Sequence, residues 1–372
     1  MDPGLLITQI ELYRSRIKLK EPFVISLGPL DHAENVIVLI RTNEGISGIG
    51  ECSPFRTIHG ETMETCMIVG AELARMLVGK NPIDIENCHS IMGKCIFGNN
   101  SIKSAIDIAL YDIAGKVKNT PLYRLLGGMQ TRELFTDYTV SLGPCEKMVE
   151  DALKIKSEGF HFIKIKLGDT VEKDIERIQR MREAVGPTIP FRVDANQGWT
   201  ADGALTILQS ISKSNIQHCE EPIPRWDFMK LPELRKKSPV PIMADESCCD
   251  ENDAARLISL NACDSINVKL GKSAGIYKAK KILALAEKSG LPVQVGGFLE
   301  SRIGFTAAAH LALSSSAVQF VDFDTPLMFA EDPVTGGIQY GPNGAVRIPE
   351  NPGLGVWIDE SYLSRQDKHI IH

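Results

Sequence analysis

The feature that most constrains the fold is a recurrence of short apolar runs, each ending in polar residues. From residue 134 to residue 324 these runs return at intervals of roughly 25 to 30 residues, enough for one strand, one helix and two loops. The stretches between them, such as 171–185, are amphipathic with a helical period. The runs occupy residues 134–143, 162–168, 191–197, 216–222, 241–247, 265–271, 292–297 and 319–324. Eight such strands are the number in a closed parallel barrel. Because loop-like segments follow the last run, we expect a TIM-like (β/α)7β barrel.

The two ends of the chain have a different pattern. Residues 7–17 and 35–51 are typical of antiparallel strands with a turn at 43–45, and residues 62–79 and 101–116 are typical of helices. The tail is again short strands and turns. We therefore expect an α+β capping domain over residues 1–130, completed by the tail at about 331–372. The barrel over 131–330 would carry the catalytic site.

Composition and charge exclude several classes of protein. The chain of 372 residues is 43% apolar and 24% charged, which is ordinary globular composition. No apolar run approaches the roughly 18 residues of a membrane helix. The net charge of −6, without a basic block, argues against nucleic acid as a partner. Nine cysteines without a CxxC pair, and no export signal at the start, indicate reduced thiols and a cytoplasmic location.

Three consecutive runs end in an acidic residue: Asp194, Glu220 and Asp245. Functional side chains of a parallel barrel come from the C-terminal ends of its strands, so these acids should converge. A single acid could equally cap a helix or lie in a turn, but three in succession are hard to explain by stability alone. Carboxylates without cysteine or histidine suit a hard divalent cation. We expect Mg²⁺, with Mn²⁺ as the alternative.

Lysines lie on both sides of this acidic arc. Lys164 and Lys166 share one face of the second strand because side chains alternate with period two. Two ammonium groups so close should lower the pKa of at least one of them, which suits a catalytic base. Lys269 ends the sixth strand, opposite the second in a ring of eight. A substrate carboxylate on the metal would thus have a base on one side of its α-carbon and an acid on the other, the arrangement of a racemase or epimerase.

Five ordered motifs carry a family resemblance: KIK (164–166), DANQGW (194–199), CEEP (219–222), ADES (244–247) and NVKLGKSAG (267–275). Together they resemble the muconate-lactonizing subgroup of the enolase superfamily, over nearly the whole chain. The superfamily uses a lysine or histidine base with Mg²⁺. The resemblance implies Mg²⁺ on Asp194, Glu220 and Asp245, with Glu220 rather than Glu221 as the ligand in CEEP.

The same resemblance assigns the remaining polar residues of these motifs. It implies that Lys166 and Lys269 form the acid–base pair and that Lys164 assists Lys166 electrostatically. Asn196 and Glu246 are then candidate hydrogen-bond partners of the metal ligands.

The last strand adds two acids, Asp322 and Asp324, on one face. It lies opposite the fourth strand, so a substrate with its carboxylate at the metal would bring a cationic end to these acids. A dipeptide has that shape, and the pair resembles that of the dipeptide epimerases, which include L-Ala-D/L-Glu epimerase. An N-succinyl or aryl substrate would bring an anion or a ring instead. The alternatives are an N-acylamino acid racemase, an o-succinylbenzoate synthase, or a non-catalytic metal-stabilised binding protein.

Substrate specificity is expected from segments 23–30 and 53–59, closing over the barrel mouth. Candidate substrate contacts are Ser26, Thr139, Gly297 and Phe298. Segment 23–30 is mostly apolar, which favours small or hydrophobic dipeptides, and Arg56 is the candidate anchor for an acidic side chain. We expect the protein to take a small-molecule dipeptide as its partner and to form a homo-oligomer.

Three further signals are set aside. Lys272 lies in a Gly-Lys-Ser sequence like the end of a phosphate loop, but Ile266 stands where that loop needs glycine. Cys248 and Cys249 are expected to be small buried thiols. His218 and His310 are expected to be packing residues.

Overall fold

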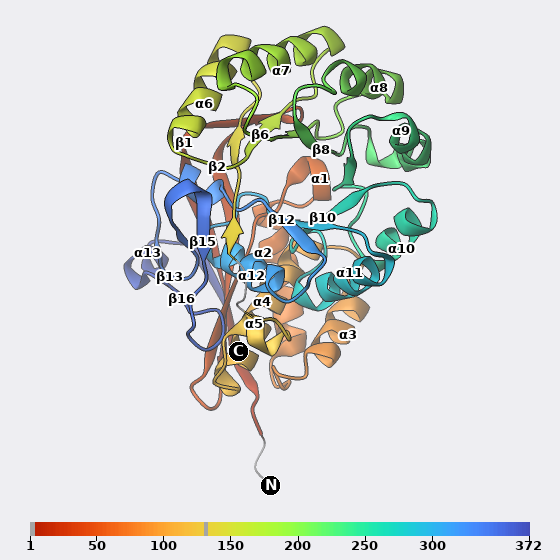
Figure 1. Ribbon diagram of the computed structural model, residues 1–372. Helices are drawn as coiled ribbons and strands as arrows, with labels where there is room; N and C mark the ends of the chain where they lie inside the picture. The colour runs from red at the N-terminus through yellow and green to blue at the C-terminus, as the bar shows by residue number, and fades with distance from the viewer. Residues whose placement is uncertain (1–3, 130–132) are drawn as a thin grey trace.

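The computed structural model describes residues 4–129 and 133–372. Its larger part is a ring of eight parallel strands in the order β12-β11-β10-β9-β8-β7-β6-β5 (Figure 1). The strands are β5 (Tyr138–Val140), β6 (Ile163–Lys166), β7 (Phe191–Asp194), β8 (Ile216–Glu220), β9 (Ile242–Ala244), β10 (Ser265–Lys269), β11 (Val293–Gly296) and β12 (Val318–Val321). The expected (β/α)7β barrel is confirmed.

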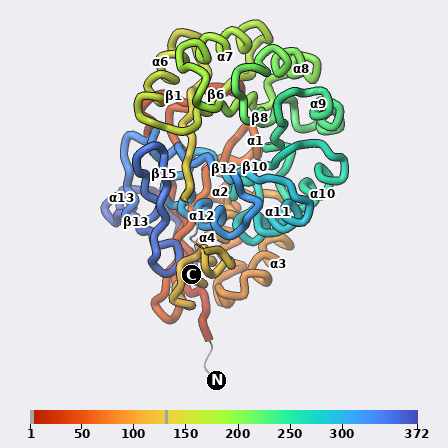
Figure 2. The backbone as a smooth tube through the Cα atoms, in the orientation of Figure 1, coloured from red at the N-terminus to blue at the C-terminus, as the bar shows by residue number. Residues whose placement is uncertain are grey.

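Helices connect the strands and follow one another around the outside of the ring (Figure 2). They are α6 (Cys145–Ser157), α7 (Val171–Val185), α8 (Ala201–Ser210), the 3₁₀ helix η1 (Arg225–Lys230) with α9 (Leu231–Lys237), α10 (Glu251–Ser259), α11 (Ile276–Ser289) and α12 (Arg302–Ala312). A short 3₁₀ helix, η2 (Thr325–Met328), follows β12 where an eighth helix would otherwise stand. No helix of the described residues is long and apolar enough to cross a membrane.

Side-chain hydrogen bonds join β5 to β12 and complete the ring. The backbone N–H of Thr139 donates to Asp324 Oδ2 at 2.7 Å, and that of Phe323 donates to Thr136 Oγ1 at 2.8 Å. The predicted first strand, 134–143, is therefore divided into β5 and a separate β4 (Leu134–Phe135). The division falls where the Thr136 N–H is taken by the carbonyl of Gly344, at 2.9 Å.

The capping domain is built on an antiparallel sheet in the order β17-β1-β2-β3. Its strands are β1 (Ile7–Ile25), β2 (Gly28–Thr42), β3 (Ser47–Cys52) and β17 (Lys368–Ile371), and its helices are α1 (Arg56–His59), α2 (Met63–Leu77), α3 (Ile85–Cys95), α4 (Asn100–Val117) and α5 (Leu122–Leu125). The predicted turn joins β2 to β3, and the two predicted helices are α2 and α4. Helix α3 was not predicted.

The tail supplies further short elements between β12 and β17. They are β13 (Val334–Gly336), β14 (Gln339–Tyr340), η3 (Pro342–Gly344), β15 (Ala345–Arg347), β16 (Val356–Ile358) and α13 (Glu360–Ser364). Strand β13 pairs with β16, and β15 pairs with both β14 and β4. The tail therefore pairs through β15 with the segment that precedes β5, and through β17 with the capping sheet.

The long hairpin formed by β1 and β2 reaches from the capping domain over the barrel mouth. Near its tip the carbonyl of Val24 accepts a hydrogen bond from the N–H of Leu142, at 2.9 Å. On the other side, Ser26 Oγ donates to the carbonyl of Asn196, also at 2.9 Å. Two strand ends of the barrel thus hold the hairpin tip in place.

Acidic residues of the cap bind the N-termini of two barrel helices. Asp107 Oδ2 on α4 accepts from the N–H of Ile276, the first residue of α11, at 2.5 Å. Glu51 on β3 accepts from the N–H groups of Ser301 and Gly304 at the start of α12, each at 3.0 Å. Such carboxylates satisfy otherwise free helix N–H groups, so the cap is fixed to the barrel by directional bonds.

Helix α4 packs against β3 at a distance that requires glycine. A Cβ at Gly50 would lie 1.9 Å from the Ala105 carbonyl oxygen, and one at Gly48 would lie 2.1 Å from that of Ala109. Since both clashes are with backbone of a buried helix, neither can be relieved by moving a side chain.

We expect Gly50→Ala to lower the free energy of unfolding by about 3 kcal/mol or more, because α4 must move away from β3. Urea unfolding followed by circular dichroism measures this change. The matched control is Gly93→Ala on exposed α3, where a Cβ meets nothing within 4 Å. That change should be neutral or stabilising by about 0.5–1 kcal/mol. Equal unfolding curves for the two variants would show that the glycine does not set the spacing.

Candidate active site

Ionisable side chains meet at the C-terminal ends of β6 to β10. In the strand register Lys166 pairs with Asp194, and Asp194 pairs with Glu220, so the three lie at one level. Asp245 is the first residue after β9, and Lys269 ends β10. All five are at least 94% buried. The sheet order places three strands between β6 and β10 on either side, so the two lysines face each other across the ring.

Ion pairs link every acid of this group to a lysine. Lys164 Nζ lies 2.9 Å from Glu220 Oε2 and 3.2 Å from Asp194 Oδ2. Lys166 Nζ lies 2.6 Å from Asp194 Oδ2. Lys269 Nζ lies 2.6 Å from Asp245 Oδ2 and 3.7 Å from Glu220 Oε1. The structure thus brings the predicted lysines and acids into one network, with the ammonium groups between the carboxylates.

The expected lowering of a lysine pKa is wrong for Lys164. Burial does lower the pKa of this ammonium, but the charges of Asp322, Glu220 and Asp194 outweigh burial and raise the pKa well above its usual value. The pKa of Lys269 is raised as well. Burial lowers it, but the charges of Asp245 and Glu220 outweigh burial. Acidic neighbours thus dominate over the ammonium–ammonium repulsion on which the expectation was based.

The oxygen atoms around the acids fit a hard cation. Asn196 donates its N–H to Asp194 Oδ1 at 2.9 Å and its amide to Glu246 Oε1 at 3.3 Å. The other side-chain oxygens of these residues, Asn196 Oδ1 and Glu246 Oε2, are buried without a hydrogen-bond partner among the described residues. Such unpaired buried acceptors next to three carboxylates suit a divalent cation with oxygen ligands such as Mg²⁺.

The two adjacent glutamates of CEEP face different surroundings. Glu220 accepts hydrogen bonds from Asn267 Nδ2 at 2.8 Å and Gln294 Nε2 at 3.3 Å, inside the ring. Glu221 instead accepts from the N–H groups of Asp245 at 2.6 Å and Ser247 at 3.2 Å. The carboxylate of Glu220 therefore lies where it could bind a metal ion, whereas that of Glu221 holds the backbone of the loop after β9.

A second acidic cluster lies where β12 meets β5. The carboxylates of Asp137, Asp322 and Asp324 are buried, with oxygens within 4.8 Å of one another. Two of the acids have cationic partners, since Asp322 pairs with Lys164 at 2.7 Å and Asp137 pairs with Arg192 at 2.9 Å. Lys164 is shared with Glu220 and Asp194 of the first group, so the three carboxylates have fewer than two full positive charges beside them.

Asp324 is the acid of this cluster whose carboxylate contacts no cationic side chain among the described residues. Burial, followed by the charge of Asp322, raises the pKa of Asp324 to about 7. The cluster can therefore accept one further cation beside Asp324, such as an ammonium group.

A small cavity of about 40 Å³ is lined by two acids of the second cluster and by the lysines that pair with the first group of acids. Its polar lining includes Thr139, Lys164, Lys166, Asn196, Lys269, Asp322 and Asp324, and its apolar lining includes Phe23, Ile25, Phe55, Ile58, Gly297, Phe298 and Leu299. The rings of Phe298 and Phe23 cover Lys269 and Lys166, with ammonium-to-centroid distances of 4.8 and 5.7 Å. Ser26, predicted as a substrate contact, donates a hydrogen bond to the Asn196 carbonyl, and its role toward a substrate stays a prediction.

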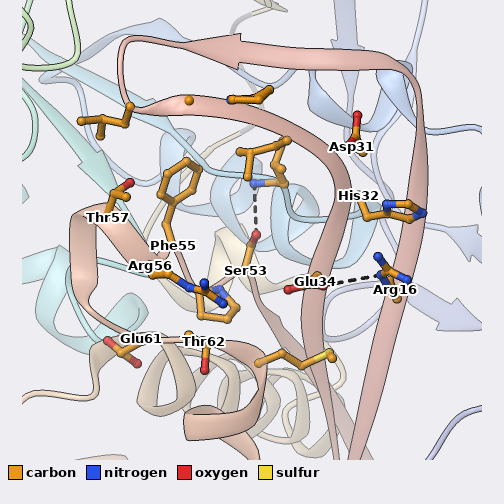
Figure 3. A pocket seen from close by; sticks show the side chains of 17 residues that line it. Arg16, Asp31, His32, Glu34, Ser53, Phe55, Arg56, Thr57, Glu61 and Thr62 are labelled. Atoms are coloured by element: carbon orange, nitrogen blue, oxygen red, sulfur yellow. Dashed lines mark hydrogen bonds and ion pairs between the residues drawn. The ribbon is translucent and has the colours of Figure 1, made fainter.

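A second cavity of about 350 Å³ lies on the outer side of Phe55 and Leu299, which line both cavities (Figure 3). Its lining combines apolar side chains with charged and polar groups of both signs, among them Arg16, Asp31, His32, Glu34, Arg56 and Glu61. Arg56, the candidate anchor for an acidic substrate side chain, therefore lies outside the apolar wall of the inner cavity. No arginine is among the described residues that line the inner cavity.

Several contributors to the site were missed in the sequence. Asn267 lies two residues before Lys269 on the same strand face, so the period-two pattern that identified the Lys164–Lys166 pair could have found it. Asp137 and Arg192 lie deeper in the ring, and no motif marks them.

The residues set aside as packing groups have partners that fit that role. His310 accepts from the N–H of Tyr123 at 3.1 Å, and His218 packs edge-on against Phe320 at 5.3 Å. Burial lowers the pKa of His218 to about 3, so it is neutral. Cys248 is buried and Cys249 partly so, both as free thiols.

Comparisons with known proteins agree with this geometry. Residues 7–127 match the mandelate racemase/muconate lactonizing enzyme N-terminal domain, and residues 147–362 match the enolase C-terminal domain-like family. The chain is 54% identical over 368 residues to a D-Ala-D/L-Ala epimerase of Cytophaga hutchinsonii, covering 99% of this chain and 100% of that one. A dipeptide epimerase from Cytophaga hutchinsonii, complexed with Mg and D-Ala-L-Val, superposes with a TM-score of 0.98 at 54% identity, covering 99% and 100% of the two chains. An N-succinyl-L-Arg/Lys racemase of Bacillus cereus is 38% identical over 359 residues, covering 96% of each.

Proposed function

The chain belongs to the mandelate racemase/muconate lactonizing enzyme family of the enolase superfamily, and on that premise we propose that it is a Mg²⁺-dependent dipeptide epimerase. The observation that carries the proposal is one cavity lined by Asp322 and Asp324 and by two lysines from opposite strands of the ring, each of which pairs with an acid of the first group. A dipeptide has a carboxylate and an ammonium at its two ends. The reaction is the inversion of the α-carbon of its C-terminal residue.

In this proposal Asp194, Glu220 and Asp245 would hold Mg²⁺, which would supply positive charge to a substrate carboxylate and so make the neighbouring α-proton more acidic. Asn196 and Glu246 orient the ligands through the bonds to Asp194 and to each other. Asp322 and Asp324 bind the ammonium of the dipeptide, which brings the missing positive charge to their cluster.

Lys166 and Lys269 move the proton. One, as the neutral amine, takes the α-proton from its face and becomes an ammonium, while the other, as an ammonium, gives a proton to the opposite face, so the carbon is inverted. Lys164 lies within 3.2 Å of Asp194, the same carboxylate that Lys166 contacts, and adds a positive charge next to the base. The rings of Phe23 and Phe298 exclude water from the two ammonium groups and so favour direct transfer to carbon.

The preferred substrates are small or hydrophobic dipeptides. The cap closes the cavity with apolar side chains, among them Phe23, Ile25 and Phe55. A charged substrate side chain would lose its hydration against this wall without finding a partner. A long acidic side chain would have to pass Phe55 to reach Arg56.

The runner-up is racemisation of N-succinylamino acids, as in the name of the Bacillus cereus relative. A succinyl group would place an anion beside Asp322 and Asp324, where like charges disfavour it. The dipeptide is therefore the better match to the charge of this end of the cavity.

Proton exchange in D₂O tests the proposal. The protein, loaded with Mg²⁺, is incubated with a library of L,L-dipeptides, and deuterium at the C-terminal α-carbon is followed by NMR. We expect exchange with Ala-Ala-like and hydrophobic dipeptides and little with acidic ones. Exchange with N-succinylamino acids but with no dipeptide would support the runner-up. Exchange with neither, at full metal occupancy, would favour a binding protein.

The pKa of Asp324 predicts how substrate binding depends on pH. Its carboxyl is protonated below about pH 7 and charged above, so the KM for a dipeptide should fall as the pH rises from 6 to 7.5. Asp324→Asn removes this titration, and we expect a KM at least about tenfold higher that changes little over the same range. Initial rates at each pH measure both effects. A wild-type KM independent of pH would contradict a role for Asp324 in holding the ammonium.

A further inference from the structure

Lys272 is a buried cation that none of the proposed steps uses. Its side chain is completely inaccessible to solvent, in the turn between β10 and α11. The ammonium contacts three oxygens: Asp245 Oδ1 at 2.5 Å, the Asn267 carbonyl at 2.9 Å, and the Asp245 carbonyl. Burying an ammonium is costly unless all its protons are bonded, and here all three have acceptors.

The backbone of Lys272 is held from two sides. Its N–H donates to the carbonyl of Lys269 at 3.0 Å. Its own carbonyl accepts from Asn100 Nδ2, at the start of α4 in the cap, at 2.7 Å. The backbone position of Lys272 is therefore set by both the barrel and the cap.

The two oxygens of Asp245 have separate partners. Oδ1 contacts Lys272, while Oδ2 lies 2.6 Å from Lys269 Nζ, inside the catalytic network. We propose that Lys272 is a positioning residue that holds Oδ1 of Asp245 and leaves Oδ2 as the single oxygen this carboxylate offers to a divalent cation. The proposal rests on the proposed role of Asp245 as a metal ligand.

A single available oxygen has a consequence for the choice of cation. Mg²⁺ requires six ligands in a near-ideal octahedron, whereas Ca²⁺ takes six to eight and readily binds both oxygens of one carboxylate. By holding Oδ1, Lys272 favours Mg²⁺. Without Lys272, Asp245 could turn both oxygens to the cation, and the preference should shift toward Ca²⁺.

The test is Lys272→Met, which fills a similar volume without charge or donor. The Kd values for Mg²⁺ and Ca²⁺ are measured by isothermal titration calorimetry without substrate. We expect Mg²⁺ affinity to fall about tenfold or more, as for other residues that orient metal ligands, while Ca²⁺ affinity is unchanged or higher. Lys288→Met on the exposed face of α11 is the control and should leave both values unchanged.

A general loss of packing would weaken both cations by the same factor, so an unchanged ratio of the two Kd values would overturn the proposal. Circular dichroism establishes that the variant is folded. If Lys272→Met does not fold, Lys272→Gln, which keeps a polar group near the carbonyls, is measured with the same expectation. Asp245→Asn separates the proposals: normal Mg²⁺ binding by that variant would show that the metal site itself is wrong.

Discussion

Epimerisation should fall at least about a thousandfold in Lys166→Ala and in Lys269→Ala, because each variant lacks the proton donor or acceptor on one face of the substrate. The two ammonium groups stand on opposite strands of the ring and contact different acids, Asp194 and Asp245. Neither lysine can reach the face served by the other. Chiral chromatography of a dipeptide after incubation measures the loss.

In both variants, the α-proton of the substrate should still exchange with deuterium from D₂O although the α-carbon is no longer inverted. The lysine that remains can still remove and return a proton on its own face, so each variant should exchange one diastereomer, and the two variants should exchange opposite ones. Lys288→Ala is the control for loss of an exposed lysine and should keep full turnover. Near-normal epimerisation by both catalytic variants would show that the two-base assignment is wrong.

Removal of divalent cations should reduce epimerisation to background, and added Mg²⁺ should restore it. An α-proton beside a free carboxylate is very weakly acidic, so the reaction depends on the charge that the cation supplies. We expect Mn²⁺ to restore activity as well, because it accepts the same oxygen ligands. Initial rates after chelation and gel filtration, with metal content measured by mass spectrometry, provide the test.

The fold should survive this treatment. Lys164, Lys166 and Lys269 each pair with at least one carboxylate of the proposed site, so removal of the cation does not leave three acids unpaired. The circular dichroism spectrum of the chelated protein should therefore be that of the native fold. The variant Asp194→Asn should lose both Mg²⁺ affinity and activity. Full turnover by protein shown to be free of metal would contradict the metal-dependent reaction.

The barrel could be predicted because its signal is local and repeated. Each strand is a short apolar run, each functional side chain stands at its C-terminal end, and period two shows which neighbours share a face. This was enough to place Lys166 and Lys269 across the ring and to bring Asp194, Glu220 and Asp245 onto the arc between them. The residue types alone then indicated an oxygen-ligated cation.

What could not be predicted depends on contacts between distant segments. Thr136 and Gly344 meet only after the tail has folded, so the division of the first run into β4 and β5 has no local signal. The direction of the Lys164 pKa shift depends on Asp322, which follows the last strand of the barrel and is far from Lys164 in the sequence. The hydrogen bond from Ser26 to the Asn196 carbonyl could not be predicted either, since it joins the hairpin tip to a distant strand end.

The position of β17 beside β1 has a consequence for the order of assembly. Tyr13 pairs with Lys368, so one edge of β1 stays unpaired until β17 has been synthesised and has reached it. Pairings between such distant segments form late, because the long intervening chain carries a high entropy cost of closure. During synthesis and refolding the edge of β1 is thus open to strands of other molecules, a known route to aggregation. Yield on refolding should therefore depend on protein concentration more steeply than the stability of the finished barrel suggests.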